Sequence, residues 1–143
     1  MRVVTLFAIG VVIMCAAMPA SAQEFDLCGN KANVVLKTPG ADASPELKKF
    51  WGVWGKGEWA GSICNALVVS EVNGDKATVE YFYGSAPGVP KPGSFVSADA
   101  TMKGKYLFFK SSKGSDVSYE FTGGQLNGWF GSTALDKKLQ KLK

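Results

Sequence analysis

The chain has 143 residues, carries 16 Lys and Arg against 12 Asp and Glu for a net charge of +4, and contains no histidine. Without histidine, catalysis by a histidine base and metal binding by histidine are excluded. The only arginine is Arg2, so bidentate arginine recognition of phosphate or guanine is excluded from the rest of the chain. Apart from the tail KKLQKLK the lysines are scattered, as on a solvated surface, and we expect no nucleic-acid interface.

The first residues have the pattern of a secretory signal peptide. Arg2 supplies a positive charge, an apolar stretch follows, and an A-x-A pattern ends at Ala22. We therefore expect residues 1–22 to be a signal peptide and the mature chain to begin at Gln23. The apolar stretch is short for a membrane span and no second one follows, so we expect a periplasmic or secreted protein without a transmembrane segment.

Two cysteines, Cys28 and Cys64, remain after the expected cleavage. An even number of cysteines in an oxidising compartment favours a disulfide over two buried free thiols. Two cysteines without any histidine do not make a zinc site, so we expect no metal and no cofactor.

Residues 23–43 show little periodicity and are predicted to form an N-terminal strap, in which NVVLKT is either a short strand or an extended segment. Residues 44–143 are predicted to form a barrel domain. Ser44 as the N-cap, Pro45 at the first helical position and Glu46 in the first turn predict a helix that Gly52 ends after about two turns.

After Gly52 the sequence is typical of antiparallel strands. Asn73-Gly74 between two β-rich runs predicts a hairpin, and SAPGVPKPGS predicts a loop. The spacing of the later runs predicts a meander, so the fold class is an all-β barrel of seven to eight strands, with a β-sandwich as the alternative. In the tail, leucines at 135, 139 and 142 fit a helical stripe, but we favour a short eighth strand that closes the sheet.

FWGVWGKGEWAG, the Asn-Gly hairpin, the Gly/Pro loop and the late NGWFG hairpin resemble the calycin barrels of lipocalin and avidin type. Similar small modules are exported alone or accompany hydrolase domains as accessory pieces. The resemblance implies that Trp54 points inward and plugs one end of the barrel, with Trp51 at the same end. The chain departs from lipocalins in lacking a late arginine that stacks on the first-strand tryptophan.

Aromatic residues are the candidates for ligand binding, and the set comprises Trp59, Tyr81, Tyr83, Tyr119 and Trp129. The tyrosines lie on the apolar faces of their strands, where they either line a cavity with hydroxyls at its mouth or belong to an ordinary core. If the leucine face of LNGWFG is the core, Trp129 lies outside, either exposed for recognition or beneath the strap.

Catalytic residues are scarce. Glu58 and Glu80 are the only acids near the aromatic clusters, Glu80 is expected to face solvent, and no serine or cysteine has a histidine to activate it. We therefore expect a non-catalytic module. It binds either a small apolar or amphipathic molecule inside the barrel, with the loop at 84–94 as its rim, or a protein or glycan on an exposed aromatic surface. A filled interior favours the second function.

Overall fold

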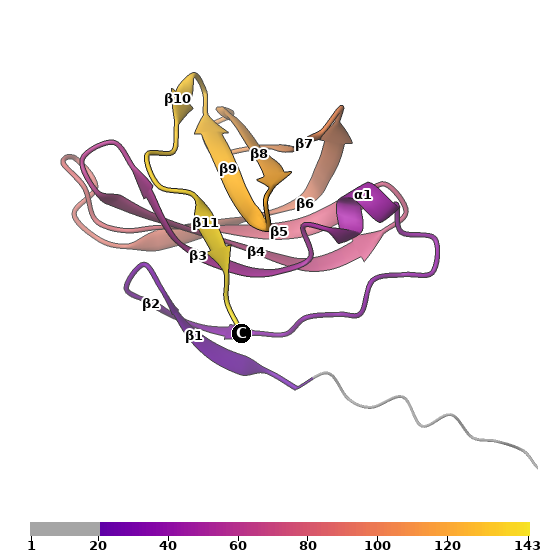
Figure 1. Ribbon diagram of the computed structural model, residues 1–143. Helices are drawn as coiled ribbons and strands as arrows, with labels where there is room; N and C mark the ends of the chain where they lie inside the picture. Colours follow the sequence, from indigo (N-terminus) through magenta and orange to yellow (C-terminus); the bar gives the residue numbers. More distant parts are fainter. Residues whose placement is uncertain (1–20) are drawn as a thin grey trace, which may run out of the picture.

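The computed structural model describes residues 21–143, so the expected signal peptide at 1–22 lies almost wholly outside the described residues. Eight antiparallel strands close into a barrel (Figure 1), as predicted, and the alternative of a sandwich is not what forms. In the order of their pairing the barrel strands are β3 (Gly52–Trp59), β4 (Ile63–Asn73), β5 (Lys76–Tyr83), β6 (Gly93–Lys103), β7 (Tyr106–Lys110), β8 (Asp116–Thr122), β9 (Gln125–Phe130) and β11 (Leu139–Lys141).

The barrel is closed by β11, which pairs with β9 on one side and with β3 on the other. Leu139 is fully buried in the barrel interior, whereas Leu142 packs against a separate apolar cluster outside it. Side chains that alternate between two apolar environments suit a strand, and this is why the tail does not form the helix that its leucine spacing also allowed. A two-residue strand, β10 (Thr133–Ala134), flanks β9.

Short turns connect most of the neighbouring strands. Asn73 pairs with Lys76 across the two-residue turn Gly74-Asp75, and Gly74 has a φ of 58° that favours glycine. The predicted hairpin is therefore present. The Gly/Pro segment at 84–92 is the predicted loop, with a single bridge between Ala86 and Val89.

The helix is shorter than predicted, since α1 (Pro45–Lys48) makes only one turn. The Ser44 Oγ accepts a hydrogen bond from the Leu47 amide at 3.3 Å, so the predicted N-cap is correct. Beyond Lys48 the backbone bonds run to the third residue back, from Phe50 to Leu47 and from Trp51 to Lys48. This tightening turns the Phe50 side chain into the core and ends the helix before Gly52.

Trp54 lies inside the barrel with 1% of its surface exposed. Its indole N–H donates to the Phe50 carbonyl at 2.7 Å, and its ring meets Phe121 edge-on. The Nζ atom of Lys141, on the closing strand, lies 5.4 Å from the centroid of the Trp54 ring. Lys141 thus places a cation near the first-strand tryptophan, the position at which lipocalins have the late arginine that this chain lacks.

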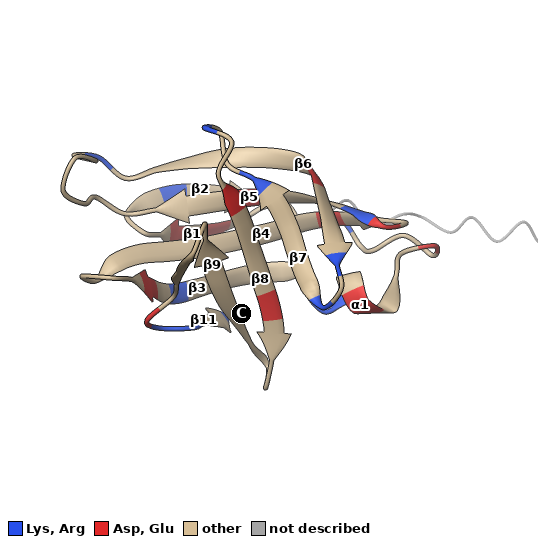
Figure 2. Cartoon of the chain, turned by 90° about the horizontal axis from the view of Figure 1, so that it is seen from above, with Lys and Arg blue, Asp and Glu red and all other residues tan. Residues whose placement is uncertain are grey.

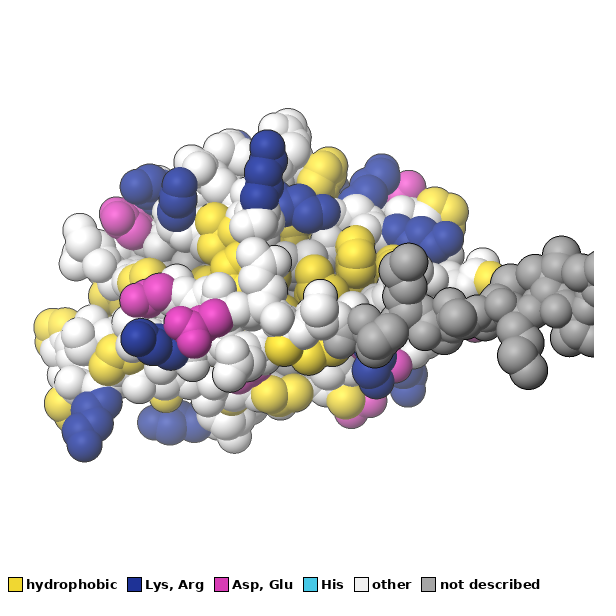
Figure 3. Space-filling view, turned by 90° about the horizontal axis from the view of Figure 1, so that it is seen from below, with side chains coloured by type: hydrophobic (Ala, Val, Ile, Leu, Met, Phe, Trp, Pro, Cys, Tyr) yellow, Lys and Arg dark blue, Asp and Glu magenta, His cyan; other side chains and the backbone are white. Residues whose placement is uncertain are grey.

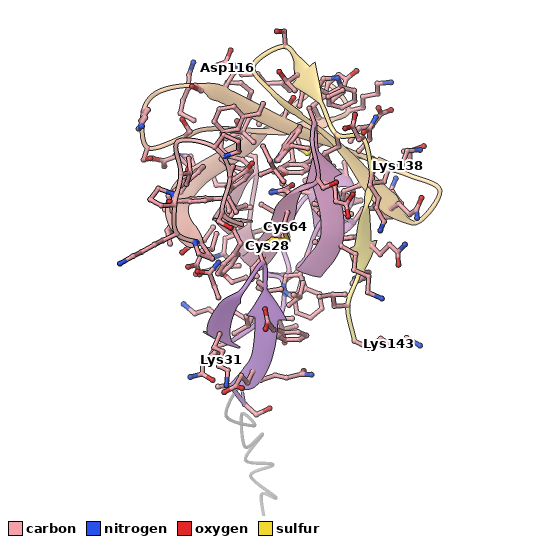
Figure 4. The ribbon with its side chains drawn as sticks, turned by 90° about the vertical axis from the view of Figure 1, so that its left-hand side faces the viewer. Cys28, Lys31, Cys64, Asp116, Lys138 and Lys143 are labelled. Carbon is pink, nitrogen blue, oxygen red and sulfur yellow. A yellow bond between two sulfur atoms is a disulfide. The ribbon has the colours of Figure 1, made fainter. Side chains whose placement is uncertain are left out.

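The predicted strap at residues 23–43 begins with a hairpin, β1 (Gln23–Leu27) and β2 (Asn30–Val34), that covers the outer face of β3, β4 and β5 (Figure 1). On the face of the molecule seen from below, hydrophobic side chains are interspersed with lysines and acids (Figure 3). Leu27 and Val34 pack there on outward-facing side chains of the barrel, namely Val53, Ala66, Val68 and Phe82. The predicted disulfide between Cys28 and Cys64 is formed, with Cα atoms 5.4 Å apart, and ties the hairpin turn to β4 (Figure 4). No helix within residues 21–143 is both long and apolar enough to cross a membrane.

Candidate ligand-binding surface

The barrel interior contains Trp59, Tyr81 and Tyr119 of the predicted site residues, and their polar atoms are bonded to one another or to the protein. The indole N–H of Trp59 donates to the Tyr81 hydroxyl at 2.7 Å. The Tyr119 hydroxyl donates to Oδ1 of buried Asn65, also at 2.7 Å. These hydroxyls therefore hold strands together across the barrel and do not line the mouth of a cavity.

Aromatic rings fill the space between these residues. Tyr81 stacks on Phe95 with centroids 4.9 Å apart, and Trp59 meets Phe130 edge-on. Burial raises the pKa of Tyr119 well above its ordinary value, and burial also raises the pKa of Tyr81. Both phenols are thus neutral core groups at physiological pH.

Tyr83 is half-buried and lies over a glycine of the neighbouring strand. Gly93 is its partner in the β5–β6 register, and a Cβ atom at Gly93 would collide with the tyrosine ring. An aromatic ring over a cross-strand glycine fills the space left by the missing side chain. Tyr83 therefore has a packing role, although its surface is partly accessible.

Trp129 is separated from the other four candidates because it points to the outside of the barrel. Its neighbour Gly128 pairs with Tyr119, and a Cβ atom at Gly128 would stand 2.7 Å from Cε1 of that ring. Only glycine fits beneath Tyr119, so the inward face of β9 is fixed at Gly128. The next side chain along the strand, Trp129, must then face outward.

The outward side chains of β7, β8 and β9 surround a shallow depression of about 360 Å³, which we call the aromatic groove. Its lining residues are Lys103, Tyr106, Phe108, Ser118, Trp129 and Gly131. Phe108 pairs with Ser118, and Ser118 with Trp129, so these three form one row across the sheet. The Tyr106 and Trp129 rings meet edge-on with centroids 5.5 Å apart, forming two walls of the groove.

The strap does not cover this groove. The hairpin lies on β3 to β5, so the alternative that Trp129 packs beneath the strap is wrong. The reason is that the Cys28–Cys64 bridge ties the hairpin to β4, and the hairpin packs Leu27, Val34 and the partly buried Phe25 on the outward apolar residues of β3 to β5. Trp129 is instead left half-buried at an open surface.

The indole of Trp129 also differs from the other three in its hydrogen bonding. Trp51 donates to the Lys37 carbonyl at 2.8 Å, and Trp54 and Trp59 donate to protein acceptors at 2.7 Å. Within the described part of the chain, the Trp129 indole has no such acceptor. Both its ring and its N–H are thus available to a ligand.

Charged residues border the groove, and Figure 2 shows a lysine at the end of β7, lysines where β6 turns into β7, and acids on β8. Lys105 forms an ion pair with Glu120 at 2.8 Å, and Lys110 is paired with Asp116. The hydrogen bond that Lys105 donates to Glu120 raises the pKa of Lys105, and the hydrogen bond that Asp116 accepts from Lys110 lowers the pKa of Asp116. Lys103 is different, since its Nζ lies 3.4 Å from the centroid of the Phe108 ring.

A second, smaller depression of about 160 Å³ lies where β2 meets the outer face of β4 to β6. Val34, Val68 and Glu80 are among its lining residues. Glu80 accepts a hydrogen bond from the Ser94 hydroxyl at 2.8 Å, whereas Oε1 of Glu58 lies 3.9 Å from the Lys137 ammonium. The two acids that the sequence singled out therefore have separate partners. Residues 21–143 contain no group of three or more His, Cys, Asp or Glu able to hold a metal ion.

Sequence reasoning found Trp129 but missed Tyr106 and Phe108. The signal for both was present in KYLFFK, where strict alternation places Leu107 and Phe109 on one face and Tyr106 and Phe108 on the other. Because Phe108 and Phe109 are adjacent and chemically equal, the sequence does not say which of them is buried. The structure resolves this, with Phe109 at 2% exposure inside the barrel and Phe108 half-buried outside.

Comparisons of the chain with protein-family models, with curated proteins and with solved structures found no match.

Proposed function

We propose that the chain is an exported, non-catalytic β-barrel module that binds a glycan on its aromatic groove. The observation that carries the proposal is the convergence of Tyr106, Phe108 and Trp129 on one open surface, where the Trp129 indole N–H has no hydrogen-bond acceptor among residues 21–143. The closed eight-stranded barrel supports a calycin-like scaffold, in which the ligand surface lies outside the barrel.

The chemistry of the groove suits a sugar better than a wholly apolar molecule. A pyranose ring has an apolar face of C–H groups that packs on an aromatic ring, and an edge of hydroxyls that needs donors and acceptors. The groove offers both, with three aromatic rings beside the Ser118 hydroxyl and the Trp129 N–H. Its shallow, open form also suits a chain that passes across it, whereas small-molecule sites enclose most of their ligand.

The interior gives less support to the other function expected from the sequence, a small apolar ligand inside the barrel. Trp54, Tyr81, Phe109 and Tyr119 each have 4% or less of their surface exposed and pack together. The two pockets described above both lie on the outer surface. A protein partner is also less favoured, because stable interfaces bury about 800 Å² on each side and the groove is a single small depression.

Export and lack of catalysis are parts of the same proposal. The Cys28–Cys64 disulfide supports an oxidising compartment, either the periplasm or the outside of the cell. The absence of histidine from the sequence supports a binding role, since the usual base and the usual metal ligand are both missing.

Affinity electrophoresis through gels that contain single soluble polysaccharides tests the proposal. We expect at least one polysaccharide to retard the wild-type protein, and Trp129→Ala to abolish that retardation while shifting the melting temperature by only a few degrees, about what a surface truncation causes. Val96→Ala is the matched control, because Val96 is an outward apolar side chain with 63% exposure that does not line the groove. Equal retardation of wild type and Trp129→Ala would contradict the proposal, as would the absence of retardation by every polysaccharide.

A further inference from the structure

We infer that the glycan is acidic, and that Lys103 binds a carboxylate attached directly to one of its sugar rings. This inference rests on the proposed function, because it names the class of glycan that the aromatic groove takes. It is carried by the position of Lys103 among the lining residues and, within residues 21–143, by the lack of any carboxylate at ion-pair distance from its ammonium.

Three lysines stand around the groove, and two of them are neutralised. Lys105 and Lys110 form ion pairs with Glu120 and Asp116. Among residues 21–143, Lys103 has no carboxylate within ion-pair distance, and its ammonium instead lies on the Phe108 ring at 3.4 Å from the centroid. The face of an aromatic ring attracts a cation but does not neutralise its charge, so a positive charge remains at the groove wall.

The strand register places this charge beside the sugar-stacking surface. Lys103 is the last residue of β6 and is the register partner of Tyr106, whereas Phe108 lies in the same row as Trp129. From β6 to β9 the sheet spans three strand spacings, roughly 14 Å, which is the scale of a short oligosaccharide lying across the strands. A sugar stacked on Trp129 and Tyr106 then has a neighbouring unit at Lys103.

A ring carboxylate fits this position better than a sulfate ester. The uronic-acid carboxylate is bonded to a ring carbon, so it stays close to the ring plane when the sugar packs on an aromatic surface. The Lys103 ammonium is held against the Phe108 ring and therefore also stays close to the groove wall. A sulfate ester projects on an additional rotatable oxygen and is better served by several converging cations than by a single lysine.

Polygalacturonate and its fully methyl-esterified form provide matched probes, because they share one backbone and differ in charge. We expect the wild-type protein to bind polygalacturonate more tightly than the ester in affinity electrophoresis at fixed ionic strength. Lys103→Met keeps the apolar stem on Phe108 and removes the charge. We expect it to weaken polygalacturonate binding roughly twofold to fivefold, the effect of one exposed ion pair, and to weaken binding of the ester by less.

Lys31→Met is the control for net charge. Lys31 is exposed on the hairpin, at the opposite end of the molecule from Asp116, which is paired with Lys110 at the edge of the groove (Figure 4). We expect this variant to bind polygalacturonate like the wild type, because a surface charge this far away is largely screened at physiological salt. A loss equal to that of Lys103→Met would show a general charge effect and overturn the inference.

Two other outcomes separate this inference from the proposed function. If the wild type binds the acid and its ester equally, and Trp129→Ala loses both, the inference of an acidic glycan is overturned while the proposal of a glycan-binding groove stands. If the wild type binds dextran sulfate more tightly than polygalacturonate, and Lys103→Met weakens that binding, the inference of a carboxylate is overturned while the inference of an anionic glycan bound by Lys103 stands. No binding of any polysaccharide by the wild type would overturn the proposed function and the inference together.

Discussion

Two parts of the outer barrel surface carry apolar side chains, and one of them is covered by the β1–β2 hairpin whereas the other is open. Over β3 to β5, Val68 and Phe82 lie beneath the β1–β2 hairpin with 3% and 2% of their surface exposed. Over β6 to β9, Phe108 and Trp129 are half-buried, and their open surface lines the aromatic groove. The first face is mainly aliphatic and the second is aromatic with a lysine at its edge.

This difference separates packing from recognition. An antiparallel sheet usually has one buried apolar face and one polar face, so outward apolar residues require either a cover or a partner. The hairpin and its disulfide supply a cover for one face, and those residues are thus part of the fold. The other face keeps its rings and one indole N–H accessible, which is why we place ligand binding there.

The sharpest test of this comparison replaces one phenylalanine on each face. Phe82→Ala should lower the free energy of unfolding by about 3–5 kcal/mol, because it opens a cavity under the hairpin. Phe108→Ala should lower it by about 1 kcal/mol or less, because the ring is already partly in water. Urea unfolding of the two variants measures both values. Equal losses would mean that the groove rings are as structural as the covered ones.

Removal of the disulfide tests the covered face alone. The double variant Cys28→Ala, Cys64→Ala should lose about 3–4 kcal/mol of stability, since the bridge closes a loop of 36 positions in the unfolded chain. We expect its groove to bind as in the wild type below the unfolding transition. Denaturation with and without reductant measures the loss. Free alkylation of both thiols in native, oxidised wild-type protein would contradict the prediction.

Alkaline pH tests the interior that lies between the two faces. Burial raises the pKa of Tyr119, so above about pH 10 the unfolded chain releases this proton and the folded chain retains it. The contribution of Tyr119 to the free energy of unfolding should therefore be constant below about pH 10, and above it the free energy of unfolding should fall by up to about 1.4 kcal/mol per pH unit. Tyr119→Phe should be less stable throughout, because it loses the bond to Asn65, but should show a smaller alkaline slope. Identical slopes in variant and wild type would exclude a buried Tyr119.

Local features of the fold were predictable because their causes are local. Ser44 and Pro45 began a helix, Asn73-Gly74 marked a hairpin, and the cysteine parity indicated the bridge. The helix length was not predictable, because Phe50 is drawn into a core built by distant strands. Leu142 shows the same limit, since its packing partner is the second cluster and that cluster depends on where the strap lies.

The candidate site was predicted only in part. Tyr81 and Tyr119 were expected on apolar faces and are there, but their hydroxyls are bonded to Trp59 and Asn65, partners that no sequence spacing reveals. Trp129 was placed outside on the condition that the leucine face of β9 is the core, and the burial of Leu126 meets that condition. The row that joins it to Phe108 depends on the register of three strands, which the alternation within one strand does not determine.

The three-residue closing strand also predicts an order in which the chain acquires its structure. Most barrel pairings join neighbouring segments, and we expect them to form early, whereas β11 pairs with β3 across most of the domain, as Gln140 does with Gly55. Long-range contacts of this kind are the slow ones in β proteins. Until β11 is in place, β3 and β9 each present a row of unpaired backbone groups, to which a strand of another chain can pair. We therefore expect β11 to protect the nascent barrel from self-association as well as to complete its circumference.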